Sequence, residues 1–92
     1  MPLRFAWDPR KASANLRKHG VSFWDAASAF EDPLSITIPD PLHSETEERF
    51  VLIGVSRKQH LVVVAHVERG DIIRIISARI ASRAERLTYE EG

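Results

Sequence analysis

The chain has 92 residues, which is enough for one domain, residues 1–92, with a modest core. It has no cysteine, which excludes thiol nucleophiles, thiolate metal sites and disulfides. No apolar run approaches the roughly 18 residues of a membrane span and no signal-peptide pattern is seen, so we expect a soluble cytoplasmic protein. The formal net charge is zero, but basic residues gather in 1–20 and 69–88 and acidic residues in 31–48. The basic ends could converge into one positive face, although ordinary solvated charge would produce the same pattern.

The first third of the chain predicts a short strand followed by two helices. Large side chains alternate over residues 3–7, as is typical of a strand. A helix is expected over 8–19, because Asp8 can cap its start and Gly20 suits the residue after its end. A second helix is expected over 22–30, where apolar residues recur at helical spacing.

The middle of the chain predicts consecutive strands. Residues 33–48 are acidic and rich in proline, so they hold at most a short edge strand. Stronger strands are expected at 49–56, 60–68 and 72–80, joined by tight turns. Consecutive strands with short connections favour an antiparallel meander.

A last helix is expected over 83–90, where Ser82 and Glu85 form an S-x-x-E capping box. The sequence therefore indicates an α+β fold, with a small antiparallel sheet of about four strands, two N-terminal helices and one C-terminal helix. The helices are expected to cover one face of the sheet, with Trp7 and Trp24 packing them against it.

Metal, cofactor and serine-triad chemistry have little support in the sequence. The four histidines, His19, His43, His60 and His66, lack H-x-x-x-H spacing, and the glycines form no phosphate-binding loop. No serine stands in a nucleophile-elbow motif. We therefore expect neither a metal ion nor a cofactor.

The first expected helix carries a polar stripe. Lys11, Asn15 and Lys18 lie at helical spacing on one side, with His19 beside them. An anion-binding face would need such residues, but a solvated helix face explains the lysines equally well. A cation in the last turn also suits the helix dipole, which is a structural role for His19.

The fourth expected strand contains arginines among apolar residues. Strict alternation puts Arg74 and Ala78 on one face and Arg79 on the other. A charge in the middle of a strand is costly to bury. Arg74 must therefore reach a carboxylate such as Glu47 or Glu68, the open face of the sheet, or a bound anion.

More arginines follow where this strand leads into the last helix. Arg83 and Arg86 lie on that helix, and Tyr89, one turn further, could stack on a base or simply pack. A solvated helix face would explain these arginines too. Several arginines around one junction nevertheless favour a phosphate-binding surface, because guanidinium forks bind phosphate oxygens and stay charged.

Three segments resemble the BrnT toxin family in their order and spacing: FAWDPRKASANLRKHGVSFWDAASAFEDP, ERFVLIGVS and GDIIRIISARIASRAERLTYE. The most specific parts are W-D-P with K-H-G-V, within Trp7 to Val21, and R-I-I-S-A-R with Y-E, within Arg74 to Glu90. The resemblance implies a RelE-like fold, ribonuclease activity that arrests growth, and a type II toxin–antitoxin pair. It also implies a BrnA antitoxin that binds the toxin and carries a ribbon-helix-helix domain, so that DNA is contacted through the complex alone.

The resemblance further implies roles for the site residues. In RelE-like nucleases the RNA 2′-hydroxyl attacks the adjacent phosphate without a metal, and basic side chains stabilise the developing charge. The candidates here are Arg74 and Arg79, followed by Arg83 and Lys11. His19 is the candidate for proton transfer, because the unperturbed pKa of histidine lies near 6.5, and His66 is the reserve. The candidate RNA contacts are Lys11, Asn15, Lys18, Arg83, Arg86 and Tyr89.

From the residues alone, two other classes of protein stay open. A non-enzymatic nucleic-acid-binding or regulatory module would use the same basic face, and it would bind RNA without cleaving it. A structural subunit would dock a partner through its edge strand or its acidic loop.

Overall fold

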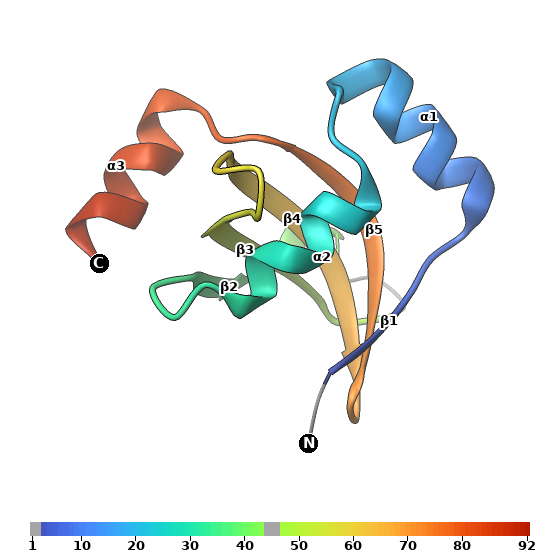
Figure 1. The fold of residues 1–92 in the computed structure, drawn as a ribbon. Coiled ribbons are helices and arrows are strands. Elements are labelled where there is room, and N and C mark those ends of the chain that lie inside the picture. Colours follow the sequence, from blue (N-terminus) through green and yellow to red (C-terminus); the bar gives the residue numbers. More distant parts are fainter. Residues whose placement is uncertain (1–2, 44–46) are drawn as a thin grey trace.

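The computed structural model describes residues 3–43 and 47–92 (Figure 1). Helices lie on both sides of one sheet. Of the helices described, none has the length and apolar character needed to cross a membrane. In chain order the elements are β1 (Arg4–Ala6), α1 (Pro9–His19), α2 (Phe23–Ser28), the 3-10 helix η1 (Ala29–Glu31), β2 (Ile36–Pro39), the 3-10 helix η2 (Pro41–His43), β3 (Arg49–Val55), β4 (Leu61–Arg69), β5 (Ile72–Ile80) and α3 (Arg83–Glu91).

The first two helices begin where their capping residues predict. Asp8 accepts a hydrogen bond from a backbone N–H in the first turn of α1, and Gly20 ends that helix in the left-handed conformation, with φ of +72°. Ser22 caps α2 in the same way as Asp8 caps α1. The second helix is shorter than predicted, because the chain tightens into η1 after Ser28.

The sheet has five strands in the order β1-β5-β4-β3-β2 and is mixed rather than purely antiparallel. β1 lies parallel to β5, whereas the other neighbouring pairs are antiparallel. The prediction of about four antiparallel strands is therefore wrong in number and direction. Turn signals identify strands that are neighbours in the chain, and they cannot reveal that residues 4–6 pair with residues 72–74. The expected edge strand in the acidic segment is confirmed as β2.

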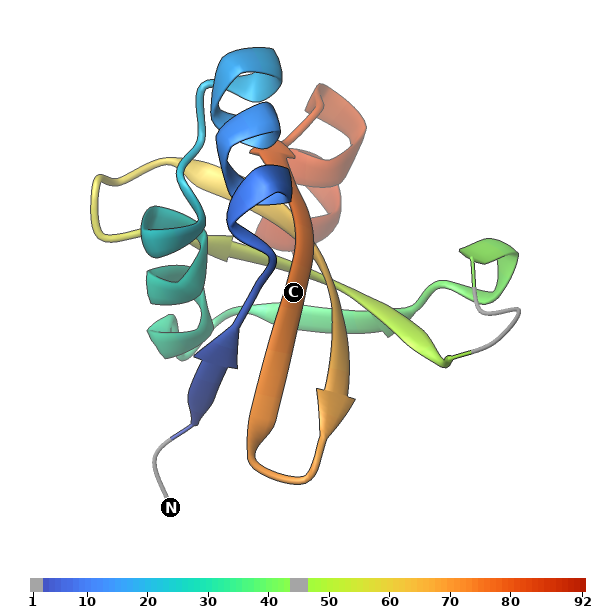
Figure 2. The ribbon, with the colours of Figure 1, turned by 90° about the vertical axis from the view of Figure 1, so that its right-hand side faces the viewer.

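The helices do not all cover one face, which corrects a second expectation. α1 and α2 lie on one side of the sheet and α3 on the other (Figure 2). The main core lies under the first two helices, where Phe23 and Ala26 pack with β-strand residues such as Val64 and Ile75. A smaller cluster lies under α3, and its buried members are Ile53, Leu61 and Val63. α3 lies on that face because its Tyr89, together with Ala81 just before the helix, packs on this cluster.

The two tryptophans differ in their surroundings. Trp7 packs edge-on against the buried Phe23, with ring centroids 5.9 Å apart, as predicted for a residue that holds helices on the sheet. Trp24 is 78% exposed and meets Trp7 edge-on at 4.9 Å. Its predicted packing on the sheet is wrong, because most of its side chain is exposed to solvent.

A β-bulge in β5 decides which face each arginine occupies. Ala65 pairs with Ser77 and His66 pairs with Ile75, so Ile76 is an extra residue without a partner on β4. Strict alternation is broken there. Arg74 and Arg79 pair with Val67 and Val63 and lie on one face, which we call the arginine face. Ala78 is instead fully buried in the main core on the opposite face. The predicted separation of the two arginines onto opposite faces is therefore wrong.

Candidate functional site

A groove on the arginine face surrounds the bulge. The cavity has a volume of about 230 Å3 and is lined by side chains from β3, β4, β5 and the β2–η2 segment. Its lining includes Asp40, His43, Arg49, Ile76, Ser77 and Arg79. We call it the bulge groove. The guanidinium groups of Arg49 and Arg79 in this lining are of a kind that binds anionic groups.

The basic side of α1 lies across the bulge from this groove. Lys11, Lys18 and His19 line a second hollow of about 220 Å3, which shares Ile76 and Ser77 with the bulge groove. Within the described part of the chain, neither lysine forms an ion pair. The fold thus places the lysines of α1 on one side of Ile76 and Ser77 and Arg79 of β5 on the other side.

Asn15, the remaining member of the α1 stripe, is part of the scaffold. It is buried, and its Nδ2 donates to the carbonyl oxygens of Ala78 at 2.8 Å and Val21 at 3.0 Å. Its Oδ1 accepts from the Ala78 N–H at 3.1 Å. β1 covers the outer edge of β5 along residues 72–74 alone, so this amide satisfies peptide groups that lie beyond it. Asn15 therefore positions α1 beside the bulge and also lines the second hollow, with its amide already hydrogen-bonded to the backbone.

Arg79 is held by a bidentate ion pair. Its Nη1 and Nη2 each donate to Glu85 at 2.7 Å. These hydrogen bonds lower the pKa of Glu85 to about 2, against the opposing effect of partial burial and with a further contribution from Ser82. The guanidinium is consequently fixed in direction while 45% of its side chain stays exposed toward the groove and solvent.

Arg74 lies on the same face in a separate hollow of about 430 Å3. Glu47 accepts from Arg74 and also from Arg69, whose Nη2 lies 2.6 Å from the carboxylate. The ion pair that the sequence offered as one way to satisfy Arg74 is therefore present. A carboxylate between two guanidinium groups occupies the position that a phosphate could take.

α3 contributes less to the groove than its arginines predict. Arg83 and Arg86 are exposed on this helix and do not line the bulge groove. The hydroxyl of Tyr89 donates to Asp32 at 2.6 Å, and this hydrogen bond, together with burial and the nearby charge, raises the pKa of Tyr89 to about 12. Tyr89 therefore fastens α3 to Asp32, and its contact with RNA stays a prediction.

Of the four histidines, two line the hollows around the bulge. His19 lies at the end of α1, and His43 lies in the bulge groove with its Nδ1 3.0 Å from Asp40. His66, the predicted reserve, is fully buried between Val64 and Glu68, which removes it from contact with a substrate. Sequence reasoning missed His43 and Arg49 as site residues. The available signal for His43 was the D-x-x-H spacing, which places the side chains of Asp40 and His43 on one turn.

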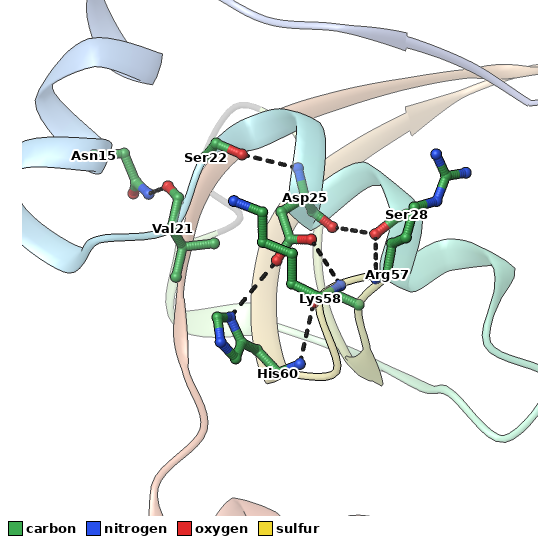
Figure 3. A network of polar contacts seen from close by, with 9 residues as sticks. Asn15, Val21, Ser22, Asp25, Ser28, Arg57, Lys58 and His60 are labelled. Atoms are coloured by element: carbon green, nitrogen blue, oxygen red, sulfur yellow. Dashed lines mark hydrogen bonds and ion pairs between the residues drawn. The ribbon is translucent and has the colours of Figure 1, made fainter.

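The remaining histidine belongs to a structural network on the other side of the molecule (Figure 3). The buried Asp25 of α2 accepts from the backbone N–H of Lys58 at 3.3 Å and lies 3.8 Å from Nδ1 of His60. Ser28 accepts from the backbone N–H of Arg57 at 2.8 Å. These contacts tie the β3–β4 turn to α2. Across residues 3–43 and 47–92, no three histidine or acidic side chains gather as metal ligands would.

The fold and the groove define a small α+β protein in which basic side chains gather around one bulge of a mixed sheet. Residues 7–85 match the family described as the ribonuclease toxin, BrnT, of type II toxin–antitoxin systems. The 1.1 Å crystal structure of the Brucella abortus ribonuclease toxin BrnT is similar, with a TM-score of 0.68 and 28% identity over 88% of this chain and 99% of that one. No curated protein matches the sequence significantly. The chain belongs to the BrnT family of ribonuclease toxins.

Proposed function

We propose that this protein is an endoribonuclease that binds RNA across the bulge of β5 and cleaves it by attack of the 2′-hydroxyl on the adjacent phosphate, without a metal ion. The proposal rests on the placement of Arg79 on one side of Ser77 and of Lys11 and Lys18 on the other. A phosphodiester lying over Ser77 would meet cationic donors from both sides. Such preorganised donors stabilise the charge that develops on phosphate oxygens during attack.

The side chains have distinct roles in this reaction. Arg79, fixed by Glu85, offers its remaining N–H groups to the attacked phosphate. His19 transfers a proton at the reacting oxygens. Arg74 binds a neighbouring phosphate of the same strand when that phosphate displaces Glu47. Arg83 and Arg86 contact RNA beyond the groove, where their exposure on α3 allows it.

We propose as partner a BrnA-like antitoxin with a ribbon-helix-helix domain, which neutralises the toxin by direct binding over the bulge groove. The toxin then meets DNA through this complex alone. Purified antitoxin should co-elute with the toxin and protect RNA from it in proportion to the amount added. An antitoxin that co-elutes while cleavage continues unchanged would contradict the proposed place of binding.

The ribonuclease proposal is tested by incubating the purified protein with RNA in the presence of a chelator. We expect fragments that carry 2′,3′-cyclic phosphates and 5′-hydroxyls, because these are the products of 2′-hydroxyl attack. Intact RNA that stays bound to the protein would instead favour a non-enzymatic binding module. Cleavage that stops when the chelator is added would contradict a metal-independent reaction.

Removal of Arg79 should slow this cleavage. We expect Arg79→Ala to lower the rate by about 100-fold or more and to abolish growth arrest on expression, because one preorganised donor to the phosphate is lost. Arg74→Ala should have a smaller effect, since Arg74 binds a flanking phosphate. Arg57→Ala removes an equal charge from the β3–β4 turn and serves as the control. Thermal unfolding followed by circular dichroism verifies that each variant is folded, and full toxicity of both the Arg79 and the Arg74 variants would contradict the assigned site.

A further inference from the structure

The reaction proposed above needs one group to accept the proton of the 2′-hydroxyl and another to donate a proton to the departing 5′-oxygen. Sequence reasoning supplied His19 for proton transfer with His66 as the reserve, and the burial of His66 leaves His19 without a second group. The bulge groove contains another imidazole, His43, on η2. Its Nδ1 lies 3.0 Å from Oδ2 of Asp40, which leaves Nε2 for a substrate.

We propose that His43 is the general base of RNA cleavage, with Asp40 as the residue that positions it. This inference rests on the proposed ribonuclease function and adds to it the group that activates the nucleophile. A carboxylate on Nδ1 holds the ring in the tautomer whose Nε2 accepts a proton, and it stabilises the imidazolium that forms.

The pair is built into the sheet rather than resting on a free loop. The backbone N–H of Asp40 donates to the carbonyl of Arg49 at 2.8 Å, at the point where β2 ends beside the start of β3. The backbone N–H of His43 donates back to the carbonyl of Asp40 at 3.3 Å, which closes the turn. The Asp40 side chain is 22% exposed, whereas that of His43 is 64% exposed. The carboxylate is thus sheltered while the imidazole is open to a ligand.

The surroundings of His43 suit a phosphodiester. Arg49 and Arg79 line the same groove, so the phosphate that they attract would bring its neighbouring 2′-hydroxyl to this side of the bulge. His19 lies on the other side of Ile76 and Ser77. Bases and acids on opposite sides of the phosphorus match an in-line displacement, in which the attacking and leaving oxygens are roughly opposite each other.

The step balances with these groups alone. The 2′-hydroxyl gives its proton to Nε2 of His43 as the bond from O2′ to phosphorus forms. The bond from phosphorus to O5′ breaks, and O5′ takes a proton from His19. The products are a 2′,3′-cyclic phosphate and a 5′-hydroxyl, and exchange of protons with water restores both histidines.

The first test compares histidine variants on an RNA linkage that the unaltered protein has been shown to cleave. We expect His43→Gln to lower kcat by about 100-fold or more, because general base catalysis contributes 10²–10⁴-fold. Asp40→Asn should lower kcat by about 10-fold with little change in KM, since it acts through His43. His60→Gln, on the other side of the molecule, is the control and should cleave normally. Imidazole added to His43→Ala should restore part of the rate.

The second test separates base from acid with an RNA in which sulfur replaces the bridging 5′-oxygen of that linkage. A thiolate leaves without a proton, so this substrate should rescue His19→Gln but not His43→Gln. Rescue of His43→Gln instead would overturn the assignment of His43 as the base. Undiminished cleavage by His43→Gln would overturn its role altogether while leaving the ribonuclease function intact. Failure of the unaltered protein to cleave any RNA would overturn both proposals.

Discussion

Glu85 serves α3 and the bulge groove at once. It accepts the backbone N–H of Ser82 at 2.8 Å, which closes the capping box, and it binds both Nη atoms of Arg79. One carboxylate therefore starts a helix and fixes the direction of a site residue. The S-x-x-E spacing predicts the first role from the four residues 82–85. The second role could not be predicted, because it requires the bulge that decides the face of Arg79.

Glu85→Gln should destabilise the protein at neutral pH and reduce its sensitivity to acid. The pKa of Glu85 is lowered to about 2 from its ordinary value of 4.5, so its ion pair stabilises the fold above pH 4.5 and is lost as the pH falls toward 2. A shift of that size corresponds to about 3 kcal/mol, which solvent screening at the half-exposed Arg79 reduces to about 1–2 kcal/mol. Urea unfolding at pH 7 and at several values below 4.5 measures the loss.

The matched control for this variant is Glu90→Gln, which removes the same charge from an exposed position on α3. Its free energy of unfolding should change by less than about 0.5 kcal/mol. Equal losses in the two variants would show that the charge of α3 matters and that the contact with Arg79 does not.

The helices and strands differ in how far local sequence determined them. Caps, turns and apolar spacing predicted the three α-helices and the long strands, because those signals act within a few residues. The parallel pairing of β1, the face that α3 occupies and the bulge at Ile76 all depend on contacts between distant parts of the chain. Alternation of side chains predicts the faces of a regular strand correctly. In β5 one extra residue, Ile76, reverses the faces of the residues that follow it.

Asn15→Ala should loosen the junction between α1 and β5. The substitution leaves the buried N–H and C=O of Ala78 without partners, and each such group costs about 1–3 kcal/mol. We expect the free energy of unfolding to fall by about 3 kcal/mol and the amide of Ala78 to exchange its hydrogen faster. Ser13→Ala, on the exposed side of the same helix, is the control. Slow exchange at Ala78 in the Asn15 variant would contradict this account.

Across the whole molecule, the charges that are separated along the chain become neighbours. The prediction that the two basic ends converge agrees with the placement of α1 beside the bulge of β5. The acidic segment folds over the same face, however, and supplies Glu47 to two arginines and Asp40 to the groove. Sequence could not predict this, because an acidic loop carries no pattern that fixes its place in a fold. A net charge of zero therefore coexists with basic side chains that gather around one segment of β5.

Glu47→Gln should strengthen the binding of RNA. Loss of this carboxylate frees Arg69 and Arg74 to contact phosphates. The slope of log affinity against log salt should steepen by about 0.7 for each phosphate newly neutralised. Fluorescence anisotropy with a labelled 2′-O-methyl RNA, which lacks the attacking hydroxyl, measures binding without cleavage. Glu90→Gln is again the control, and identical salt slopes for the two variants would contradict the exchange of carboxylate for phosphate.

The amide of Asn15 also has a consequence for how this protein behaves among its own copies. The exposed edge of a strand carries unpaired backbone N–H and C=O groups. Another polypeptide can pair with these groups as an additional strand, which is a route to aggregation. By offering a donor and an acceptor to Ala78, Asn15 imitates a peptide group of a further strand and occupies those backbone groups beyond the part of β5 that β1 covers. The side chain of Asn15, which positions the lysines of α1, thus also opposes edge-to-edge pairing of β5 between two copies of the protein.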